Sequence, residues 1–465
     1  MVDDEGALRR TVLIIATLAA FLTPFMGSAV HVALPSIGSE FGMDAISLSW
    51  IASSYLLSTA MFLVPLGRYA DIYGRKRIFS LGVLVFSASA LFAALSFSGT
   101  MLILFRFLEG IGSAMIYGTG IAMITSVFPS GERGRALGIN VTAVYLGLSL
   151  GPMLGGLLTE YLTWRSIFLA NIPLGIYILA SIQRHLRVEW TDARGERFDL
   201  PGSLLYAAML LAIMYGFSQL PGAAGFWLIL IGGAIFVLFV RMEGRVESPV
   251  LNVRLFRQNR RFAFSNLAAL INYGATFAVG FLLSLYLQYV RGFDPGIAGL
   301  ILIGQPVIQS IFATPAGRLS DRVDPAWVAS AGMSLTAVGL ILLTFLDEQT
   351  AMAYVVGCLV LLGFGFALFS SPNTNAIMSC VDRSFYGVAS GMLATMRTVG
   401  MMFSLGIATV AIAVFLGSVP ISPEYYREFL LAMQAAFTLF AGLCILGVFA
   451  SLARGPACPS PGRGA

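Results

Sequence analysis

The segment Gly67-Arg-Tyr-Ala-Asp-Ile-Tyr-Gly-Arg-Lys-Arg77 joins two long apolar runs, and its beginning recurs as Gly317-Arg-Leu-Ser-Asp321. Each copy stands at the end of an apolar run, and the two lie 250 residues apart. A charged turn that recurs between apolar spans indicates a duplicated membrane scaffold. Six spans per half would occupy only about 200 residues. The excess predicts two further spans between the halves.

The composition places the chain in a membrane. Of its 465 residues, 58% are hydrophobic and only 11% are charged, and the mean hydropathy is +0.86. A soluble domain of this length would need a charged surface that this composition cannot supply. The net charge of +5 lies in short loops separated by apolar runs, so no continuous basic surface forms and no nucleic-acid partner is expected.

A helix needs about 20 apolar residues to cross the hydrocarbon core. Fourteen segments reach this length, which predicts an all-α polytopic membrane protein. The segments lie near 11–35, 46–69, 77–97, 101–127, 136–160, 164–184, 201–220, 224–242, 262–290, 296–316, 326–346, 351–377, 387–416 and 428–452.

These spans divide the chain into two six-helix bundles with two inserted helices. We expect an N-terminal bundle over 1–190, a linker with two spans over 191–261, a C-terminal bundle over 262–453 and a cytoplasmic tail over 454–465. The end of the linker, 244–261, mixes apolar residues with arginines. That pattern fits a helix lying on the inner leaflet and fits a solvated basic loop equally well.

The basic residues predict the orientation. With the N-terminus in the cytoplasm, all but five of the 28 Lys and Arg residues lie inside. Three would lie outside, namely Arg165, Arg291 and Arg427, and two lie within spans. This asymmetry predicts a multi-pass protein of the inner (plasma) membrane with both termini cytoplasmic.

The loop after the second span is a candidate gate. Its two glycines let two helices approach closely, and Asp71 offers an anion to a helix N-terminus or an arginine. Such a contact can hold one conformation and break in another. The alternative is an ordinary positive-inside loop. The candidate gating residues are Gly67, Arg68, Asp71, Gly74, Arg75, Lys76 and Asp321.

Two further segments make the pattern more specific. The fourth span carries Arg106-Phe-Leu-Glu-Gly-Ile-Gly112, and the fifth carries Gly147-Leu-Ser-Leu-Gly-Pro-Met-Leu-Gly-Gly156. The latter continues into Trp164-Arg-Ser-Ile-Phe-Leu-Ala-Asn-Ile-Pro-Leu-Gly175. Together with the loop after the second span, these segments resemble the major facilitator superfamily, and in particular its fourteen-helix drug:proton antiporters.

The resemblance implies a secondary transporter that exports drugs or other amphipathic molecules in exchange for protons. It also implies that the fifth-span segment is the antiporter motif, with Gly147, Gly151, Pro152, Gly155 and Gly156 as its matching positions. Three of these glycines stand four residues apart, so another helix can pack against their backbone. Simple glycine-mediated packing, without any meaning for the direction of transport, remains the alternative.

Glu109 is the most informative single residue. An ionised group at mid-bilayer costs about 2.5–3.5 kcal/mol even on the lenient insertion scale, so such groups are usually functional. Arg106 precedes it by three residues and shares its helix face. Glu109 either binds and releases a proton under the influence of Arg106 or forms a fixed salt bridge with it.

The first span departs from the family pattern. The resembled family commonly places an aspartate before a V-A-x-P sequence, and here Met26 occupies that place in Pro24-Phe-Met-Gly-Ser-Ala-Val-His-Val-Ala-Leu-Pro35. Met26 and Glu109 fall at similar depth. We therefore hypothesise that Glu109 performs the missing carboxylate's role. His31 is either a proton relay or a hydrogen-bonded packing residue.

Polar residues in the later spans are candidates for a central substrate cavity or for interhelical contacts. Arg397 has no acid in its own span and could attract an anionic substrate group. The full set of cavity candidates is Met26, Tyr117, Asn272, Tyr273, Gln305, Gln309, Asn373 and Arg397.

The predicted function is proton-coupled export of hydrophobic or amphipathic small molecules by alternating access. The first rival is an exporter of an endogenous lipid, siderophore or metabolite on the same scaffold. The distant rivals are a membrane enzyme and a sensor. The expected partners are the substrate, protons and the bilayer, and the chain is expected to be a monomer. Two histidines and four cysteines without a CxxC pair predict no metal, no cofactor and no disulfide framework.

Overall fold

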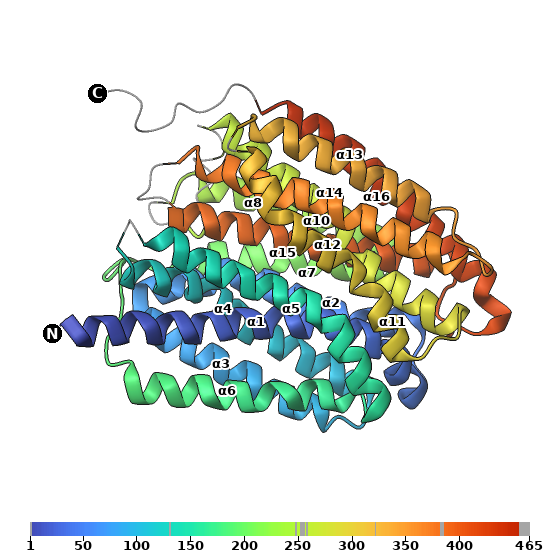
Figure 1. The fold of residues 1–465 in the computed structure, drawn as a ribbon, viewed down its shortest axis with the longest axis horizontal. Coiled ribbons are helices and arrows are strands. Elements are labelled where there is room, and N and C mark those ends of the chain that lie inside the picture. The colour runs from blue at the N-terminus through green and yellow to red at the C-terminus, as the bar shows by residue number, and fades with distance from the viewer. Residues whose placement is uncertain are drawn as a thin grey trace. The chain divides into compact units, whose positions relative to one another are not determined.

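The structure is a computed structural model that describes residues 2–129, 132–246, 249–251, 256, 259–320, 322–381 and 386–454. Within these ranges it contains helices and no β-strand (Figure 1). The helices are α1 (Val2–Phe41), α2 (Ala45–Tyr73), α3 (Arg75–Ala94), α4 (Gly99–Val127), α5 (Arg133–Tyr161), α6 (Arg165–His185), α7 (Leu200–Ser218), α8 (Ala223–Glu243), α10 (Arg260–Leu285), α11 (Pro295–Leu302), α12 (Gly304–Ser320), α13 (Pro325–Leu343), α14 (Met352–Met378), α15 (Tyr386–Phe415) and α16 (Tyr426–Leu452).

The described residues contain 14 helical segments long and apolar enough to cross a membrane, which confirms the predicted fold class and span count. Two of them are compound. Helix α10 continues through a π-helical turn, Tyr286–Val290, and α11 with α12 forms one segment, Pro295–Ser320. The boundary residues fit the chemistry of helix starts. Asp44 accepts the Ser47 N–H at 2.6 Å, and Ser98 accepts the Met101 N–H at 3.2 Å.

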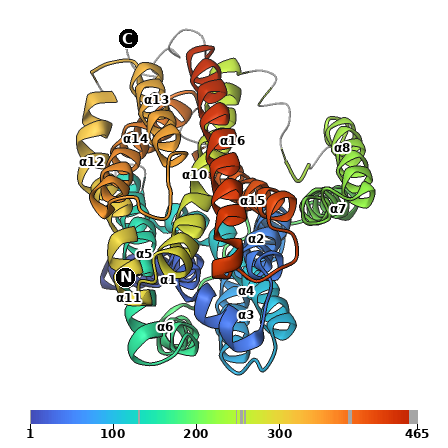
Figure 2. The same cartoon turned by 90° about the vertical axis from the view of Figure 1, so that its right-hand side faces the viewer.

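The chain forms two compact units. Unit 1 comprises Met1–Ala212, Ile231–Val250 and Asp294–Gly299. Unit 2 comprises Ile213–Leu230, Leu251–Phe293 and Leu300–Ala465. The two additional helices, α7 and α8, pair with each other (Figure 2), and each contributes residues to both units. The segment 244–261 is predicted either as a helix on the inner leaflet or as a solvated basic loop, and its residues 247, 248, 252–255, 257 and 258 lie outside the described residues.

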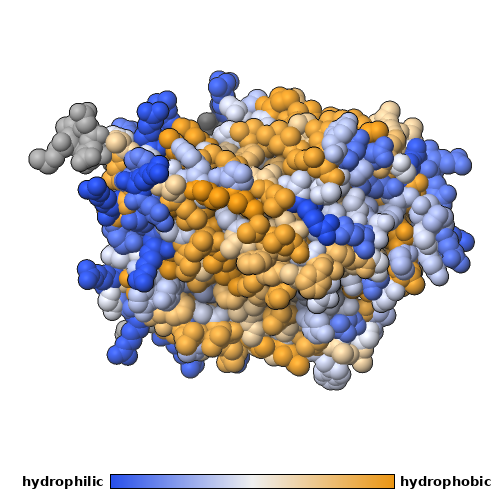
Figure 3. Space-filling view, turned by 90° about the horizontal axis from the view of Figure 1, so that it is seen from below, coloured by the Kyte–Doolittle hydropathy of each residue, from blue (hydrophilic) through white to orange (hydrophobic). Residues whose placement is uncertain are grey.

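The surface carries the apolar belt of a membrane protein. On the face drawn in Figure 3, apolar residues occupy the middle and hydrophilic residues collect toward the two ends. Helix α8 shows why the composition is so apolar, because Phe226, Trp227 and Phe236 are each at least half exposed. Such large apolar side chains are stable on a surface only against lipid.

The duplication extends from the turn into the helix contacts. In unit 1, a methyl group at Gly82 of α3 would stand 3.0 Å from the Gly112 carbonyl oxygen of α4. In unit 2, a methyl group at Gly332 of α13 would stand 2.6 Å from the Gly365 carbonyl oxygen of α14. Gly82 and Gly332 are 250 residues apart, which is the spacing of the two charged turns. Both halves therefore use glycine at the same place to bring two helix backbones together.

The described cysteines differ in their bonding. Cys358 and Cys444 are free and buried, whereas Cys380 is disulfide-bonded. The spacing of four cysteines carries no information about which of them meet in space.

We predict that Gly332→Ala lowers the thermal stability of the purified protein. The new methyl group would also stand 2.6 Å from the Phe369 backbone nitrogen, so α13 and α14 must separate, and such overpacking costs about 1–3 kcal/mol. Gly357→Ala on α14 is the control, because a methyl group there meets nothing within 4 Å. Equal melting temperatures for the two variants would contradict the prediction.

Candidate functional site

A buried ion pair lies inside unit 1 on α4. Arg106 Nη1 donates to Glu109 Oε2 at 2.8 Å, and the two side chains are 1% and 0% exposed. The pair is local because residues three apart share a helix face. Glu109 Oε1 is buried and accepts no hydrogen bond from any described residue. A buried carboxylate with one unpaired oxygen is costly to keep ionised, so this group can accept a proton there.

Arg106 is held from a second helix. Its Nε donates to the Ile51 carbonyl oxygen at 3.2 Å, and its guanidinium lies 4.2 Å from the centre of the Tyr55 ring. The Tyr55 hydroxyl donates to the Thr23 carbonyl oxygen at 2.9 Å and lies 3.0 Å from Ser113 Oγ. Tyr55 thus connects the charged pair to α1, α2 and α4.

The other candidates of unit 1 lie around this connection. Met26 is fully buried on α1, one turn beyond Thr23. His31 is 6% exposed on the same helix, and its ring is close enough to Arg106 for their charges to interact. Tyr117 on α4 interacts electrostatically with Tyr55. The structure therefore brings the proton-coupling candidates and Tyr117 into one neighbourhood.

The glycines of α5 face α1. A methyl group at Gly147 would stand 2.5 Å from the Phe21 carbonyl oxygen, and one at Gly155 would stand 2.7 Å from the Ala29 carbonyl oxygen. At Gly151 it would overlap Ser28 Oγ. The α1 residues that lie against these glycines are Phe21, Pro24, Phe25, Ser28 and Ala29. Helices α1 and α5 can therefore approach this closely only because these positions of α5 are glycines, which agrees with the packing expected from their spacing.

Gly156 and Pro152, the remaining residues of this set, contact the residues of α11 that belong to unit 1. A methyl group at Gly156 would stand 2.3 Å from the Pro295 carbonyl oxygen. The carbonyl oxygen of Pro152 lies 2.2 Å from where a methyl group on Gly299 would stand. One turn further along α5, Glu160 Oε2 accepts the Gly296 N–H at 2.9 Å.

The loop between α2 and α3 is held by charges. Asp71 Oδ1 accepts from Arg75 Nε at 2.8 Å and from Nη2 at 2.7 Å. Arg75 also donates to Ser126 Oγ of α4 at 2.8 Å. Gly74 has a φ of +125°, a backbone conformation that favours glycine. Gly67 lies against Gly118 of α4.

The loop after α6 supplies acids that sequence reasoning missed. Arg75 Nη1 pairs with Asp192 Oδ2 at 2.6 Å, and Arg68 pairs with Glu196. Glu189 accepts the Lys76 N–H at 2.8 Å. The sequence shows these acids in a loop that also contains arginines, but no local pattern indicates that the acids contact the α2–α3 loop. Asp321, the corresponding aspartate of the second copy, lies outside the described residues.

A second ion pair closes the opposite end of unit 1. Both nitrogens of the Arg165 fork donate to Glu40, at 2.8 Å and 2.6 Å, and Trp164 Nε1 donates to the same carboxylate at 2.7 Å. This contact joins the end of α1 to the start of α6. It was not anticipated, because the partners are more than 120 residues apart.

Unit 2 contains the remaining cavity candidates. Arg397 Nη2 donates to Thr374 Oγ1 at 3.2 Å, and its guanidinium lies 5.4 Å from the centre of the Tyr273 ring. Asn373 Nδ2 donates to the Ser265 carbonyl oxygen at 3.2 Å. Three buried amide groups, those of Asn272, Gln309 and Asn373, have at least one atom without a hydrogen-bond partner among the described residues. Gln305 is half-buried on α12.

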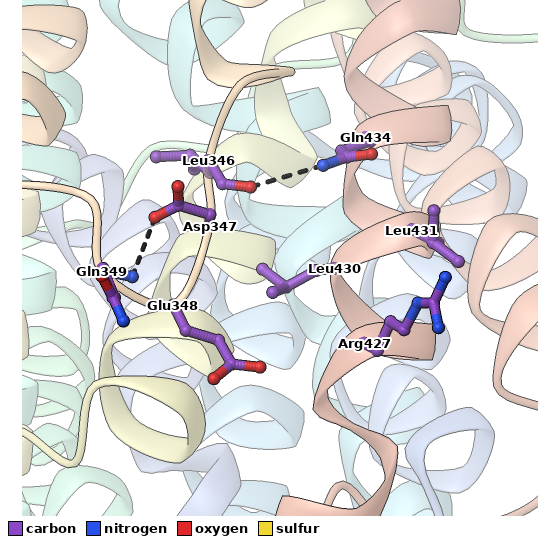
Figure 4. Close-up of a pocket in the computed structure, with 8 residues that line it drawn as sticks. All are labelled: Leu346, Asp347, Glu348, Gln349, Arg427, Leu430, Leu431 and Gln434. Carbon is purple, nitrogen blue, oxygen red and sulfur yellow. Dashed lines mark hydrogen bonds between the residues drawn. The ribbon is translucent and has the colours of Figure 1, made fainter.

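A pocket of about 470 Å³ lies elsewhere in unit 2 (Figure 4). It is formed by the loop after α13 and the first turns of α16. Its polar lining includes Asp347, Glu348 and Arg427, and Gln434 Nε2 donates to the Leu346 carbonyl oxygen across it at 3.4 Å. None of the predicted cavity residues lines it. Among the described residues, no group of three or more His, Cys, Asp or Glu side chains could hold a metal ion.

We predict that Arg106→Gln and Glu109→Gln each destabilise the protein and that the double variant is more stable than either. Removing one partner of a buried pair leaves an uncompensated charge and typically costs about 3–5 kcal/mol, whereas replacing both with neutral groups avoids that cost. The four melting temperatures of a double-mutant cycle measure the coupling. Additive losses would contradict a mutual dependence of the two charges.

Comparison with known proteins agrees with this architecture. The model of the Major Facilitator Superfamily matches residues 16–242 and 266–463. A riboflavin transporter of Clostridioides difficile is 28% identical over 440 residues, covering 94% of this chain and 95% of that protein. A cephamycin export protein of Amycolatopsis lactamdurans is 33% identical over 407 residues, covering 85% of this chain and 84% of that protein. A multidrug resistance protein of Mycobacterium tuberculosis is 30% identical over 424 residues, covering 89% of this chain and 78% of that protein.

Solved structures show the same fold. A bacterial homologue of the human lysosomal transporter Spinster superposes with a TM-score of 0.68 at 15% identity, covering 96% of this chain and 97% of that one. The family match extends over both halves and includes the segments that carry Glu109 and the glycines of α5. The chain therefore belongs to the Major Facilitator Superfamily and is a multi-pass membrane transporter rather than an enzyme.

Proposed function

We propose that this transporter exports a hydrophobic or amphipathic small molecule in exchange for protons, with Glu109 as the residue that takes up the proton. The observation that carries the proposal is the state of the Glu109 carboxyl group. It is fully buried, one oxygen is bound to Arg106, and the other has no hydrogen-bond partner among the described residues. A free acceptor atom in a low-dielectric site is where a proton is best stabilised.

The contacts of Arg106 suggest how protonation could act on the conformation. A neutral Glu109 attracts Arg106 less, so the guanidinium would depend more on the Ile51 carbonyl oxygen and the Tyr55 ring. Tyr55 is bound to the α1 backbone at Thr23, and the next residue of α1, Pro24, lies against Gly147 of α5. Protonation can therefore bias the packing of α1, α2 and α4, and a change in relative stability of two states is what coupling requires.

The charged loop would act as the gate of this cycle. In the described state, the α2–α3 turn is held through Asp71, Arg75 and Arg68 to the loop after α6. We propose that these bonds stabilise one facing state and break in the other. Alternating access by two six-helix halves about a midplane site is the general mechanism of such scaffolds.

The substrate class is supported by chemistry and by relatives. Tyr273, Arg397 and the buried amides of unit 2 offer an aromatic face, a cation and hydrogen-bond groups for an amphipathic molecule. The multidrug resistance and cephamycin export relatives favour export. We further propose that the protein is a monomer in the inner membrane, as in its bacterial relatives' hosts. Both termini would be cytoplasmic, since the distribution of basic residues predicts that orientation.

The test uses everted membrane vesicles with an acid interior and a fluorescent pH reporter. Lipophilic cations, neutral drugs and anionic amphiphiles are added in turn. We expect at least one compound to release protons from wild-type vesicles and to release none with Glu109→Gln, because glutamine cannot bind a proton there. Glu348→Gln is the control, since this carboxyl group lies in an exposed outer loop.

Proton release that persists in Glu109→Gln would assign coupling to another group. Loss of release in Glu348→Gln as well would indicate a general effect of removing acids. Immunoblots of the vesicles confirm equal amounts of each variant.

A metabolite or vitamin is the second candidate substrate. The observation that favours it is the riboflavin transporter relative, which matches nearly the full length of this chain. Adding riboflavin to the same vesicle panel separates the two candidates. Flux of labelled riboflavin without any drug-induced proton release would favour the metabolite substrate.

A further inference from the structure

Three helix ends meet at one end of unit 2. Arg261 in the first turn of α10 forms a forked ion pair with Asp324, which caps the start of α13, at 2.5 Å and 3.4 Å. The end of α16 lies against the first two turns of α13, because Ser330 Oγ donates to Ser451 Oγ at 2.8 Å and Ser451 Oγ donates to the Ala326 carbonyl oxygen at 3.5 Å. Arg454 follows three residues after Ser451. The arrangement places two arginines and one aspartate together.

The aspartate is already fully used. Asp324 Oδ1 accepts the Arg261 guanidinium and also the Ala326 N–H at 2.9 Å. Burial raises the pKa of Asp324, but the Ala326 N–H and Arg261 outweigh it and leave the pKa lowered. Asp324 therefore carries a firm negative charge that attracts both Arg261 and Arg454, and one negative charge faces two positive ones.

Among the described residues, Arg454 interacts with the charge of Asp324 but has no hydrogen-bond partner. Its side chain is 1% exposed, and none of its three guanidinium nitrogens donates a hydrogen bond to a described residue. Burial, and then the charge of Arg261, lower the pKa of Arg454 to about 9, so it remains a cation at neutral pH. Arg261 Nε also has no hydrogen-bond partner within the described part of the chain. A buried cation without hydrogen-bond partners is costly unless an anion binds it.

The donors at this place match one kind of anion. A guanidinium presents a planar fork that fits two oxygens of a phosphate group. The N-terminus of α13, a helix of 19 residues, adds backbone partial positive charge on the same side. Asp324 leaves the cluster open to the outside, since its side chain is 32% exposed.

We propose that Arg454, together with Arg261 and the N-terminus of α13, binds a phosphate-type oxyanion, supplied by an anionic phospholipid headgroup or by free phosphate. On the predicted orientation, this end of unit 2 faces the cytoplasmic leaflet, where anionic headgroups lie. Binding would neutralise the buried charge and hold the ends of α10, α13 and α16 together. The site is independent of Glu109 and of the transported substrate.

The test measures the thermal stability of the full-length protein in nanodiscs. One series raises the fraction of phosphatidylglycerol in phosphatidylcholine, and the other adds inorganic phosphate to pure phosphatidylcholine discs. We expect wild-type stability to rise and saturate in one of the series. Arg454→Gln should need about tenfold more of the same anion or more, because one charge-assisted hydrogen bond typically contributes that factor.

Two variants make the result specific. Arg454→Lys keeps the positive charge but lacks the planar guanidinium, so its affinity for the anion should lie between those of wild type and Arg454→Gln. This variant also tests the proposal if Arg454→Gln does not fold. Arg427→Gln, which removes a cation at the pocket by the first turn of α16, should behave as wild type.

The two series identify the source of the oxyanion. Saturation only with phosphatidylglycerol assigns a lipid headgroup, and saturation with inorganic phosphate assigns a free oxyanion. Equal half-saturation in wild type and Arg454→Gln, or no saturation in either series, would overturn the proposal.

Discussion

The cost of holding charge away from water governs the inner structure of unit 1. Arg106 and Glu109 are almost completely buried, and each depends on the other because neither could remain ionised alone at this depth. That dependence explains why Arg106 is also held by a carbonyl oxygen and an aromatic ring. It also makes the pair responsive, since adding one proton to Glu109 removes the charge–charge attraction to Arg106. The same atoms therefore stabilise the bundle and make it sensitive to protonation.

Close backbone contacts supply the second constraint. The hydrophobic effect gives little help between helices in lipid, so association depends on packing. Glycines on α5 against α1, and the Gly82 and Gly332 contacts in the two units, bring helices together without side chains between them. Such an interface consists of smooth surfaces, which can shift relative to each other with less repacking than interdigitated large side chains. Gly82 and Gly332 occupy equivalent positions, which indicates that both halves use the same glycine contact between two helices.

The sequence predicts what depends on local pattern. Span number follows from apolar length, and the Arg106–Glu109 pair follows from a spacing of three. Partners distant in the chain were not predictable, because no local rule connects Tyr55 to Thr23 and Arg106, or Glu40 to Arg165. The acids after α6 were missed for a related reason: Glu189, Asp192 and Glu196 were present, but only the fold shows that they face the α2–α3 turn. The cysteine spacing likewise gave no indication that Cys380 is disulfide-bonded.

The ion pairs of unit 1 differ in solvent exposure and therefore in their sensitivity to dissolved salt. Arg68 with Glu196, and Arg75 with Asp192, include carboxylates that are 43% and 66% exposed. Dissolved ions reach such pairs and screen them, because the Debye length falls from about 8 Å at physiological ionic strength to about 3 Å at 1 M. The Arg106–Glu109 pair is inaccessible to those ions. The ionic strength of the compartment that bathes the loop after α6 can therefore act directly on the bonds of the turn, whereas the buried pair does not feel dissolved ions directly.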